Sequence, residues 1–223
     1  MVNSHCLAIF GASGHGKVVA DIALQTGWDA VFFYDDAWQS KPRLEHWKVH
    51  GGMALLLREV HRFGGVVVAV GNNSIREIAL GRVCGAQGRL VTLIHPKAAV
   101  SPLARVEVGG VVMPGAVVNA FATIGRGGIV NSGATVDHDC RLGACVHIAP
   151  GAHLSGNVVV GRGSWIGVGA VVRQGVTIGE RAMIGAGAAV VTDIADDLTV
   201  VGVPARPLED RPAMVEVPTG SLG

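Results

Sequence analysis

The chain has 223 residues with 18 basic and 17 acidic side chains, and its formal net charge is +1. So small a charge gives no support to a nucleic-acid partner or to binding at an anionic membrane surface. No apolar run reaches the length of a membrane span, and the opening residues, MVNSHCLAIF, are too few and too uncharged for a secretory signal. The four cysteines, at positions 6, 84, 140 and 145, show no paired or CxxC spacing, so we expect reduced, mostly buried thiols in a cytoplasmic protein.

The first predicted element is a short strand at residues 7–10, which ends at a loop rich in glycine. This loop, Gly11-Ala-Ser-Gly-His-Gly-Lys17, leads into VVADIALQ, whose apolar residues have helical spacing. The spacing GxxGxG differs from the dinucleotide-binding fingerprint. Its glycines would still let the backbone approach a diphosphate, which the free N–H groups at the helix N-terminus would bind. A tight turn with no ligand would show the same residues.

A second predicted strand, at residues 30–34, ends in Asp35 and Asp36. Acidic residues at this point, about 20 positions beyond a glycine loop, are placed to accept hydrogen bonds from the ribose or base of a nucleotide. An exposed turn has a similar composition, so these two residues alone leave both interpretations open.

The rest of the first 95 residues completes an alternating pattern. It predicts a short helix at 53–63, a buried strand at 64–70, a helix at 74–87 capped by Ser74, and a last strand at 90–94. The alternation is typical of a Rossmann-like α/β domain, here over residues 1–95. Ligands of such sheets bind at the carboxyl ends of the strands, where Gly11–Gly16, Asp35–Asp36 and Gly71–Asn73 all fall. This convergence predicts a nucleotide-type pocket.

The remainder of the chain is organised by a period of six residues. Val, Ile or Leu stands, without a gap, at Val100, Val106, Val112, Val118, Ile124, Val130, Val136, Leu142, Ile148, Leu154, Val160, Ile166, Val172, Ile178, Ile184 and Val190. Four places after most of these marks comes a small residue. This period fits neither an α-helix nor a lone strand; it predicts a parallel β-helix whose triangular coils take about 18 residues each. We expect about five coils in a domain over residues 96–207, followed by a flexible tail at 208–223.

Several motifs together give the chain a specific resemblance. They are IFGASGHGKVV, FYDD, VGNNSIR, LIHPKA, VNSGATVDHDCRLGACVHIAPGAHLSGNVVVG and VGVPAR. Over residues 6 to about 208 the chain resembles the bacterial nucleotide-sugar N-acetyltransferases of bacillosamine and perosamine biosynthesis and, more loosely, the O-acetyltransferases of sialic acid pathways. The resemblance implies a left-handed parallel β-helix and a homotrimer with active sites at the subunit interfaces. It also implies acetyl-CoA as co-substrate, with no metal.

The resemblance carries roles onto individual residues. His138 matches the catalytic base, and Asp139 matches the acid that supports it, where the family often has the longer Glu. The residues expected near the nucleotide-sugar are Ser13, Gly14, His15, Asp35, Asp36 and Gly71. Those expected near acetyl-CoA are His147 at the acetyl end, Gly156, and Val168 and Ala186 as backbone contacts along the groove.

The chemistry explains why these residue types are needed. An amine attacks the thioester carbonyl and must lose a proton, which a neutral histidine oriented by a carboxylate can accept. The oxyanion needs a donor, for which His147 or the N–H of Gly156 are candidates. The sequence therefore predicts an acetyl-CoA-dependent N-acetyltransferase that acts on the 4-amino group of a UDP- or GDP-linked 4-amino-4,6-dideoxysugar.

Three alternatives remain: an O-acetyltransferase acting on a sialic acid-type sugar, a zinc-binding β-helix protein, and a non-catalytic scaffold or nucleotide-sugar sensor. In β-helix carbonic anhydrases, histidines hold zinc between subunits. The residues 18 positions from His138 are Ala120 and Gly156, and those around His147 are Ile129 and Trp165. No histidine stacks over either one, which argues against a three-histidine zinc site.

Overall fold

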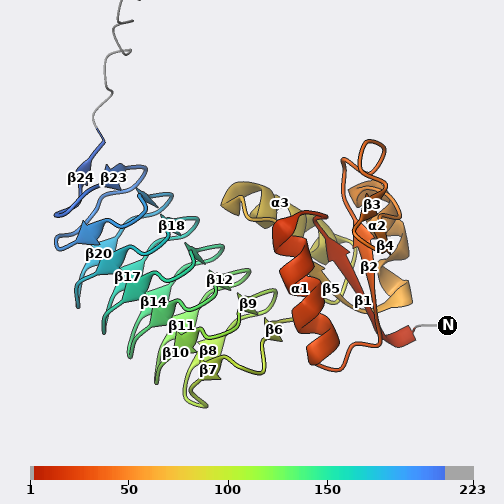
Figure 1. Cartoon of the computed structure of the whole chain (residues 1–223), viewed down its shortest axis with the longest axis horizontal. Coiled ribbons are helices and arrows are strands. Elements are labelled where there is room, and N and C mark those ends of the chain that lie inside the picture. The colour runs from red at the N-terminus through yellow and green to blue at the C-terminus, as the bar shows by residue number, and fades with distance from the viewer. Residues whose placement is uncertain (1–2, 209–223) are drawn as a thin grey trace, which may run out of the picture.

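An α/β domain at the start of the chain leads into a solenoid of short parallel strands, as the computed structural model of the protein shows (Figure 1). The structure describes residues 3–208. The predicted Rossmann-like α/β domain followed by a left-handed parallel β-helix is confirmed. Of the predicted tail, residues 209–223 lie outside the described part of the chain.

The α/β domain is built on a three-stranded parallel sheet in the order β2-β1-β5. Its elements are β1 (Asn3–Phe10), α1 (Gly14–Gln25), β2 (Ala30–Tyr34), β3 (Arg43–Leu44), β4 (Trp47–Lys48), α2 (Met53–Glu59) with a 3₁₀ turn (Val60–Arg62), β5 (Phe63–Val68) and α3 (Asn73–Gly85). Strands β3 and β4 form a small antiparallel hairpin. The predicted cap of the third helix is wrong, because Asn72, not Ser74, accepts a hydrogen bond from the N–H of Ile75, and the helix begins one residue earlier.

Helices cover the two faces of this sheet differently. Helix α1 buries Val19, Ile22 and Ala23 against one face, because these apolar residues recur at helical spacing. The hydrophobic cluster on that face continues into the first coils of the solenoid through Val111 and Met113. Helices α2 and α3 pack on the other face. The α/β domain therefore shares a core with the solenoid.

The solenoid repeats a two-residue strand and a four-residue corner. Its strands are β7 (Ala99–Val100), β8 (Arg105–Val106), β9 (Val111–Val112), β10 (Val117–Val118), β11 (Thr123–Ile124), β12 (Ile129–Val130), β13 (Thr135–Val136), β14 (Arg141–Leu142), β15 (His147–Ile148), β16 (His153–Leu154), β17 (Val159–Val160), β18 (Trp165–Ile166), β19 (Val171–Val172), β20 (Thr177–Ile178), β21 (Met183–Ile184) and β22 (Ala189–Val190). The second residue of every strand is one of the sixteen aliphatic marks. From Val112 onward all of these marks are buried, and Val100 and Val106 are partly buried.

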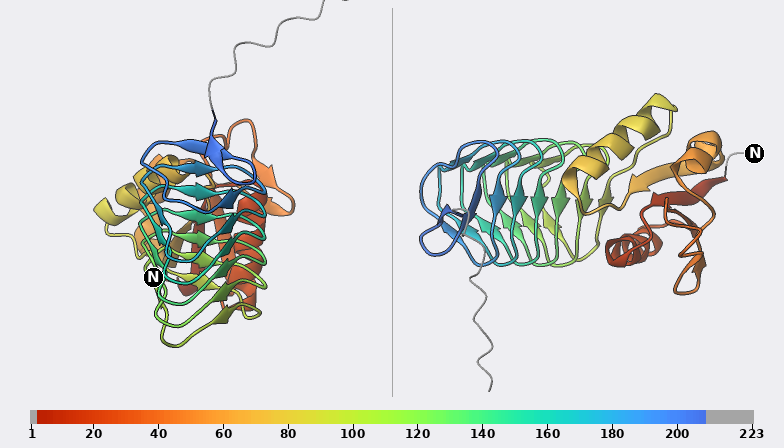
Figure 2. Two further views of the ribbon diagram at one scale, coloured as in Figure 1. Left: turned by 90° about the vertical axis from the view of Figure 1, so that its left-hand side faces the viewer. Right: turned by 90° about the horizontal axis from the view of Figure 1, so that it is seen from above.

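Each coil adds one strand to each of three parallel sheets, and neighbouring coils pair residues 18 positions apart, such as His147 with Trp165. The six strands of the β7–β22 sheet correspond to about six coils, one more than expected. The β6–β24 sheet extends further at both ends, through β6 (Leu93–Ile94), β23 (Thr199–Val201) and β24 (Arg206–Pro207). Figure 2 shows the stacked coils in two further views, with α3 beside them.

The strand predicted at residues 90–94 divides between the two domains. Leu90 bridges to Val66 beside β5, but β6 (Leu93–Ile94) pairs with β9 in the solenoid. An apolar run can pair with either sheet: Val66 of β5 makes backbone hydrogen bonds with Arg89 and Val91, and the open edge of the first coil takes the residues that follow. The solenoid backbone therefore begins a few residues before the expected boundary at residue 96. Among residues 3–208, no helix has the length and apolar character that crossing a bilayer requires.

Candidate active site

The glycine loop follows β1 and opens at the N-terminus of α1. Gly11 has a φ of 115°, and a Cβ there would lie 2.4 Å from the backbone oxygen of Ala69. A Cβ at Gly16 would lie 2.2 Å from the oxygen of Gly11, so these two glycines are required by the close approach of backbones. A Cβ at Gly14 would meet no atom within 4 Å. Gly14 therefore leaves open space in front of the helix N-terminus, where a phosphate would bind.

Asp35 and Asp36 lie beside this loop but also hold its surroundings together. Asp35 accepts hydrogen bonds from the N–H groups of Ala12 at 2.7 Å and Ala37 at 2.8 Å. Asp36 accepts one from the N–H of Met53 at 2.7 Å, at the start of α2. Part of their role is thus to fix the loop and the helix, which the acidic pattern alone did not predict.

His15, within the glycine loop, meets His147 of the solenoid where the two domains touch. Their ring centroids are 6.5 Å apart, and Trp165 lies 4.0 Å from His147 on the next coil. Nε2 of His147 lies 3.1 Å from the side-chain nitrogen of Asn131. The backbone of Gly71 lies close enough to the His147 ring to act on its pKa. Nε2 of His15 is buried without a hydrogen-bond partner in the described chain. Buried polar atoms are rarely left this way, so this nitrogen is available to a ligand.

Both imidazoles are held neutral by their surroundings. Burial lowers the pKa of His147 to about 3 and that of His15 to about 4, and the positive charge of Arg76 acts in the same direction. The Arg76 guanidinium is buried and donates to uncharged acceptors: the backbone oxygens of Val70, Gly71, Gly127 and Cys145 and the side-chain oxygen of Asn73. It therefore fastens α3 to the solenoid, and its positive charge acts on the two histidines beside it.

The second group of candidate residues lies on a corner of the solenoid, residues 137–140 between β13 and β14, which we call the His138 corner. Nδ1 of His138 is 2.7 Å from a carboxylate oxygen of Asp139. The φ of Asp139 is 61°, in the left-handed region that Asp tolerates well among non-glycine residues. The shorter side chain therefore suits this backbone and still reaches the imidazole.

Asp137 binds the backbone of His138 and adds a negative charge near its imidazole. One of its carboxylate oxygens accepts from the backbone N–H of His138 and from the side chain of Asn119, each at 2.7 Å. The hydrogen bond with Asp139 raises the pKa of His138 above its ordinary value, and the charges of Asp137 and Asp139 add to this effect. His138 is thus a stronger base than an isolated histidine.

Gly156 occupies the same corner position as His138, one coil later. A Cβ at Gly156 would lie 2.5 Å from both Cε1 and Nε2 of the His138 ring, so only glycine leaves the ring in this place. Pro102 occupies the same position two coils before His138 and has no N–H. The hydrogen bonds between coils therefore do not require a backbone donor at this position. The Gly156 N–H makes no hydrogen bond with the described residues and lies beside the imidazole. It is therefore available as an oxyanion donor.

Within one chain the two groups lie on different sides of the solenoid. The His138 corner joins the β7–β22 sheet to the β8–β20 sheet, whereas His147 and the α/β domain lie on the β6–β24 sheet. Val168 and Ala186 stack in one column on another corner of the solenoid, the one that joins the β6–β24 sheet to the β7–β22 sheet. The N–H of Gly187 donates to the oxygen of Val168 there, at 2.8 Å. The structure thus brings the glycine loop and His147 together but keeps the His138 corner apart from them.

Two family models and several solved structures match this chain, and they agree with one another. Residues 6–83 match the family of PglD N-terminal domains, and residues 157–191 match the bacterial transferase hexapeptide family. The acetyltransferase domain of PglB from Neisseria gonorrhoeae, solved with acetyl coenzyme A, is 46% identical, with a TM-score of 0.87 over 92% of this chain and 99% of that one. A perosamine N-acetyltransferase from Caulobacter crescentus, solved with CoA and GDP-perosamine, is 39% identical, with a TM-score of 0.85 over 92% of this chain and 97% of that one.

The chain belongs to the bacterial nucleotide-sugar N-acetyltransferases of the bacillosamine and perosamine type. A curated relative, the UDP-N-acetylbacillosamine N-acetyltransferase of Bacillus subtilis, is 37% identical over 111 residues, which are 48% of this chain and 50% of that protein. This alignment therefore spans about half the length of the curated relative. The family resemblance read from the sequence motifs is confirmed.

Some residues of this N-acetyltransferase site were not found from the sequence. Asn73, Arg76, Asn131 and Trp165 organise the domain interface, and no spacing pattern marks them. Arg76 stands on a helix, where a lone arginine is usually exposed, so its burial followed only from the packing of α3 on the coils. The side-chain amide of Asn73 donates to the backbone oxygens of Gly163 and Ser164. These hydrogen bonds also follow only from the packing of α3 on the coils.

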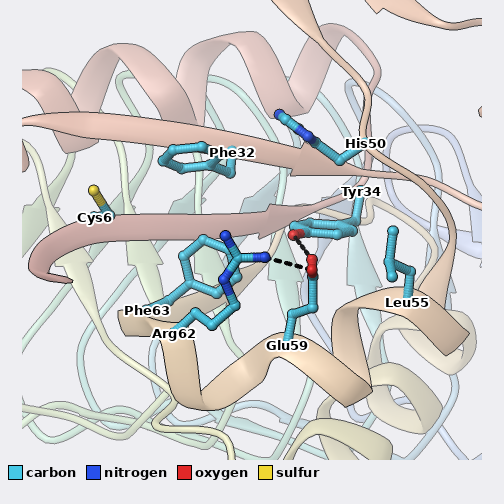
Figure 3. Close-up of a pocket in the computed structure, with 8 residues that line it drawn as sticks. All are labelled: Cys6, Phe32, Tyr34, His50, Leu55, Glu59, Arg62 and Phe63. Atoms are coloured by element: carbon cyan, nitrogen blue, oxygen red, sulfur yellow. Dashed lines mark hydrogen bonds and ion pairs between the residues drawn. The ribbon is translucent and has the colours of Figure 1, made fainter. Parts of the chain in front are cut away.

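A separate cavity of about 280 Å³ lies on the α2 face of the sheet (Figure 3). Phe32, Phe63 and His50 line it, and the Tyr34 hydroxyl donates to Glu59 at 2.7 Å. The Arg62 guanidinium also donates to Glu59, at 2.5 Å, and the cavity is not part of the glycine-loop site. Among residues 3–208 there is no group of three or more His, Cys, Asp or Glu side chains that could hold a metal.

Proposed function

We propose that this protein transfers the acetyl group of acetyl-CoA to the 4-amino group of a nucleotide-linked 4-amino-4,6-dideoxysugar. The relatives' substrates support this proposal: acetyl coenzyme A for the Neisseria domain, GDP-perosamine for the Caulobacter enzyme, and a bacillosamine nucleotide for the Bacillus enzyme. The observation that carries it is the His138–Asp139 pair at 2.7 Å, with the N–H of Gly156 beside the ring.

The reaction needs no covalent enzyme intermediate, because the thioester is already activated. The sugar amine attacks the carbonyl carbon, a C–N bond forms, and Nε2 of His138 accepts the proton that the nitrogen loses. Asp139 fixes the tautomer and stabilises the resulting imidazolium. The N–H of Gly156, or the neutral ring of His147, donates to the oxyanion. The C–S bond then breaks, and the imidazolium returns its proton to the CoA thiolate.

A complete site requires two copies of the chain, and we propose a homotrimer. One chain would supply the nucleotide-sugar site, with Ser13, Gly14 and His15 at the diphosphate, and the neighbouring chain would supply the His138 corner. This arrangement is supported by the separation of the two groups on different sides of the solenoid. Closed cyclic assembly with one repeated interface would then generate three equal sites.

Replacing Gly14 with tryptophan should abolish nucleotide-sugar binding without unfolding the protein. A Cβ at Gly14 meets no atom within 4 Å, so the side chain fits the fold but fills the space in front of the α1 N-terminus. We expect the KM for the nucleotide-sugar to rise by about 100-fold or more, with the melting temperature unchanged. Gly81→Trp is the matched control, because Gly81 is also exposed on a helix with no atom within 4 Å. Equal kinetics for the two variants would show that no phosphate binds at Gly14.

The experiment that tests the function is a thiol-release assay with acetyl-CoA and a panel of UDP- and GDP-linked 4-aminosugars. We expect release of CoA thiol with at least one of them, and an N-acetylated product by mass spectrometry. Thiol release with a hydroxyl acceptor alone would indicate an O-acetyltransferase. Stoichiometric zinc with no thiol release would favour a metal-binding β-helix protein, and neither activity nor metal would indicate a scaffold.

A further inference from the structure

Phe121 occupies a position where both the backbone and the surroundings disfavour an aromatic side chain. Its φ is 63°, in the left-handed region, and its side chain is 62% exposed. Bulky residues are rare in this region, whereas Gly, Asn and Asp adopt it readily. The same corner position in the next three coils holds Asp139, Asn157 and Gly175, all with positive φ. Phe121 is thus the residue in this run that does not suit its backbone.

No packing within the described chain compensates for this geometry. Phe121 belongs to none of the three hydrophobic clusters, although the corner beneath it contributes the buried Ala122 to the solenoid core. A strained backbone and an exposed aromatic ring at one residue are both unfavourable for the isolated chain. Such strain is found mainly at functional sites, where a ligand or partner uses the side chain.

The position of Phe121 in the solenoid indicates which ligand its side chain would contact. The N–H of Asp139 donates to the oxygen of Ala120 at 3.2 Å, so Phe121 lies one coil before the His138 corner, at a strand spacing of about 4.8 Å. Gly156, the candidate oxyanion donor, lies one coil after His138. Gly156 therefore lies on the later-coil side of His138. On the earlier-coil side, the exposed Phe121 directly follows Ala120, the residue 18 positions before His138.

The donor and the acceptor would reach His138 from different sides. Val168 and Ala186, expected along the pantetheine groove, lie one and two coils beyond the coil of His147. Acetyl-CoA would therefore approach from the later coils, on the side of Gly156. The earlier coils, on the side of Phe121, are left for the acceptor sugar.

We propose that Phe121 contacts the C6 methyl group of the acceptor and makes the enzyme select a 6-deoxysugar over the corresponding 6-hydroxy sugar. This inference rests on the proposed function. C6 is attached to C5, the neighbour of the reacting C4, so the methyl lies within about one coil spacing of the base. An aromatic face packs well against a methyl group, whereas a hydroxyl in that place would lose its hydrogen bonds to water.

The test compares two sugars and two variants. Phe121→Asn places a residue that adopts positive φ readily, so its melting temperature should equal or exceed that of the wild type. We expect kcat/KM for the 4-amino-4,6-dideoxysugar nucleotide to fall about tenfold or more, and kcat/KM for its 6-hydroxy analogue to change by less than about twofold. The KM for acetyl-CoA should not change. Leu103→Ala is the control, because Leu103 is 59% exposed in the same column, one coil farther from His138, and both sugars should react as in the wild type.

The outcomes separate this inference from the proposed function. An unchanged ratio of kcat/KM between the two sugars in Phe121→Asn would overturn the inference. A smaller oligomer by size-exclusion chromatography with light scattering would also overturn it, because Phe121 would then be a subunit contact. If the wild-type protein released no thiol with any sugar nucleotide, the proposed function itself would fail.

Discussion

Replacing His138 with alanine should lower kcat by about 10²- to 10⁴-fold, the range expected when a general base is removed. Nδ1 of His138 is engaged by Asp139 at 2.7 Å, so in the proposed mechanism Nε2 takes the proton from the amine. The side chain is 61% exposed, so its removal should leave the melting temperature and the affinity for acetyl-CoA unchanged. His153→Ala is the matched control, because His153 is an exposed solenoid histidine whose side chain hydrogen-bonds that of Thr135, and its kcat should stay within about twofold.

The pH dependence of the rate tests the same assignment. The Asp139 hydrogen bond raises the pKa of His138 above 6.5, and only the neutral imidazole can accept a proton. The rate should therefore fall as the pH drops through a value above 6.5. Asp139→Asn removes the largest cause of the raised pKa, so this fall should move to lower pH while kcat decreases. If His138→Ala kept the wild-type kcat from about pH 6 to pH 9, another group would be the base.

Replacing Gly156 with alanine should reduce kcat by about 100-fold, because the new Cβ would displace the catalytic imidazole. This Cβ would lie 2.5 Å from Nε2 and Cε1 of His138, well inside van der Waals contact. Ala120 stands in the same column, so alanine itself suits the backbone there. The ring must move, and both its alignment with the amine and the oxyanion donor are disturbed.

A double variant separates this displacement from a general loss of folding. In a His138→Ala background the imidazole that the new Cβ would displace is absent. Adding Gly156→Ala to His138→Ala should therefore lower kcat by a far smaller factor than Gly156→Ala lowers the kcat of the wild type. Melting temperatures and steady-state thiol release for the four proteins measure the coupling. Fully additive effects on kcat would show that Gly156 acts independently of His138.

The solenoid could be predicted in detail because its period is imposed at every coil. Each aliphatic mark, from Val112 to Val190, is buried where the sequence placed it, and the residue pairs 18 positions apart are those expected. The strand at residues 90–94 was harder, because an apolar run such as Leu90–Ile94 can extend either sheet. Its division between β5 and β9 depends on which edge is open, a tertiary property that local residues do not encode.

The candidate site could be predicted as a set of residues but not as an arrangement. His138 and His147 are nine positions apart, which is half a coil, so they lie on different sides of the solenoid. The buried Arg76 and the bridging roles of Asp35 and Asp36 depend on contacts between distant segments. The strain at Phe121 could not be predicted from the sequence either, because only the backbone geometry shows that φ is positive at this corner position.

The central claim is that one chain supplies the nucleotide-sugar site and a neighbouring chain supplies the base. Subunit complementation tests it directly, with Gly14→Trp and His138→Ala co-expressed under two tags and purified as mixed oligomers. Each variant alone should be inactive, because each lacks one half of every site. Every mixed trimer contains one interface in three that joins two intact halves, so about a third of the wild-type thiol-release rate should return. A mixed oligomer no more active than its two parents would contradict the claim, because both halves would then belong to the same chain.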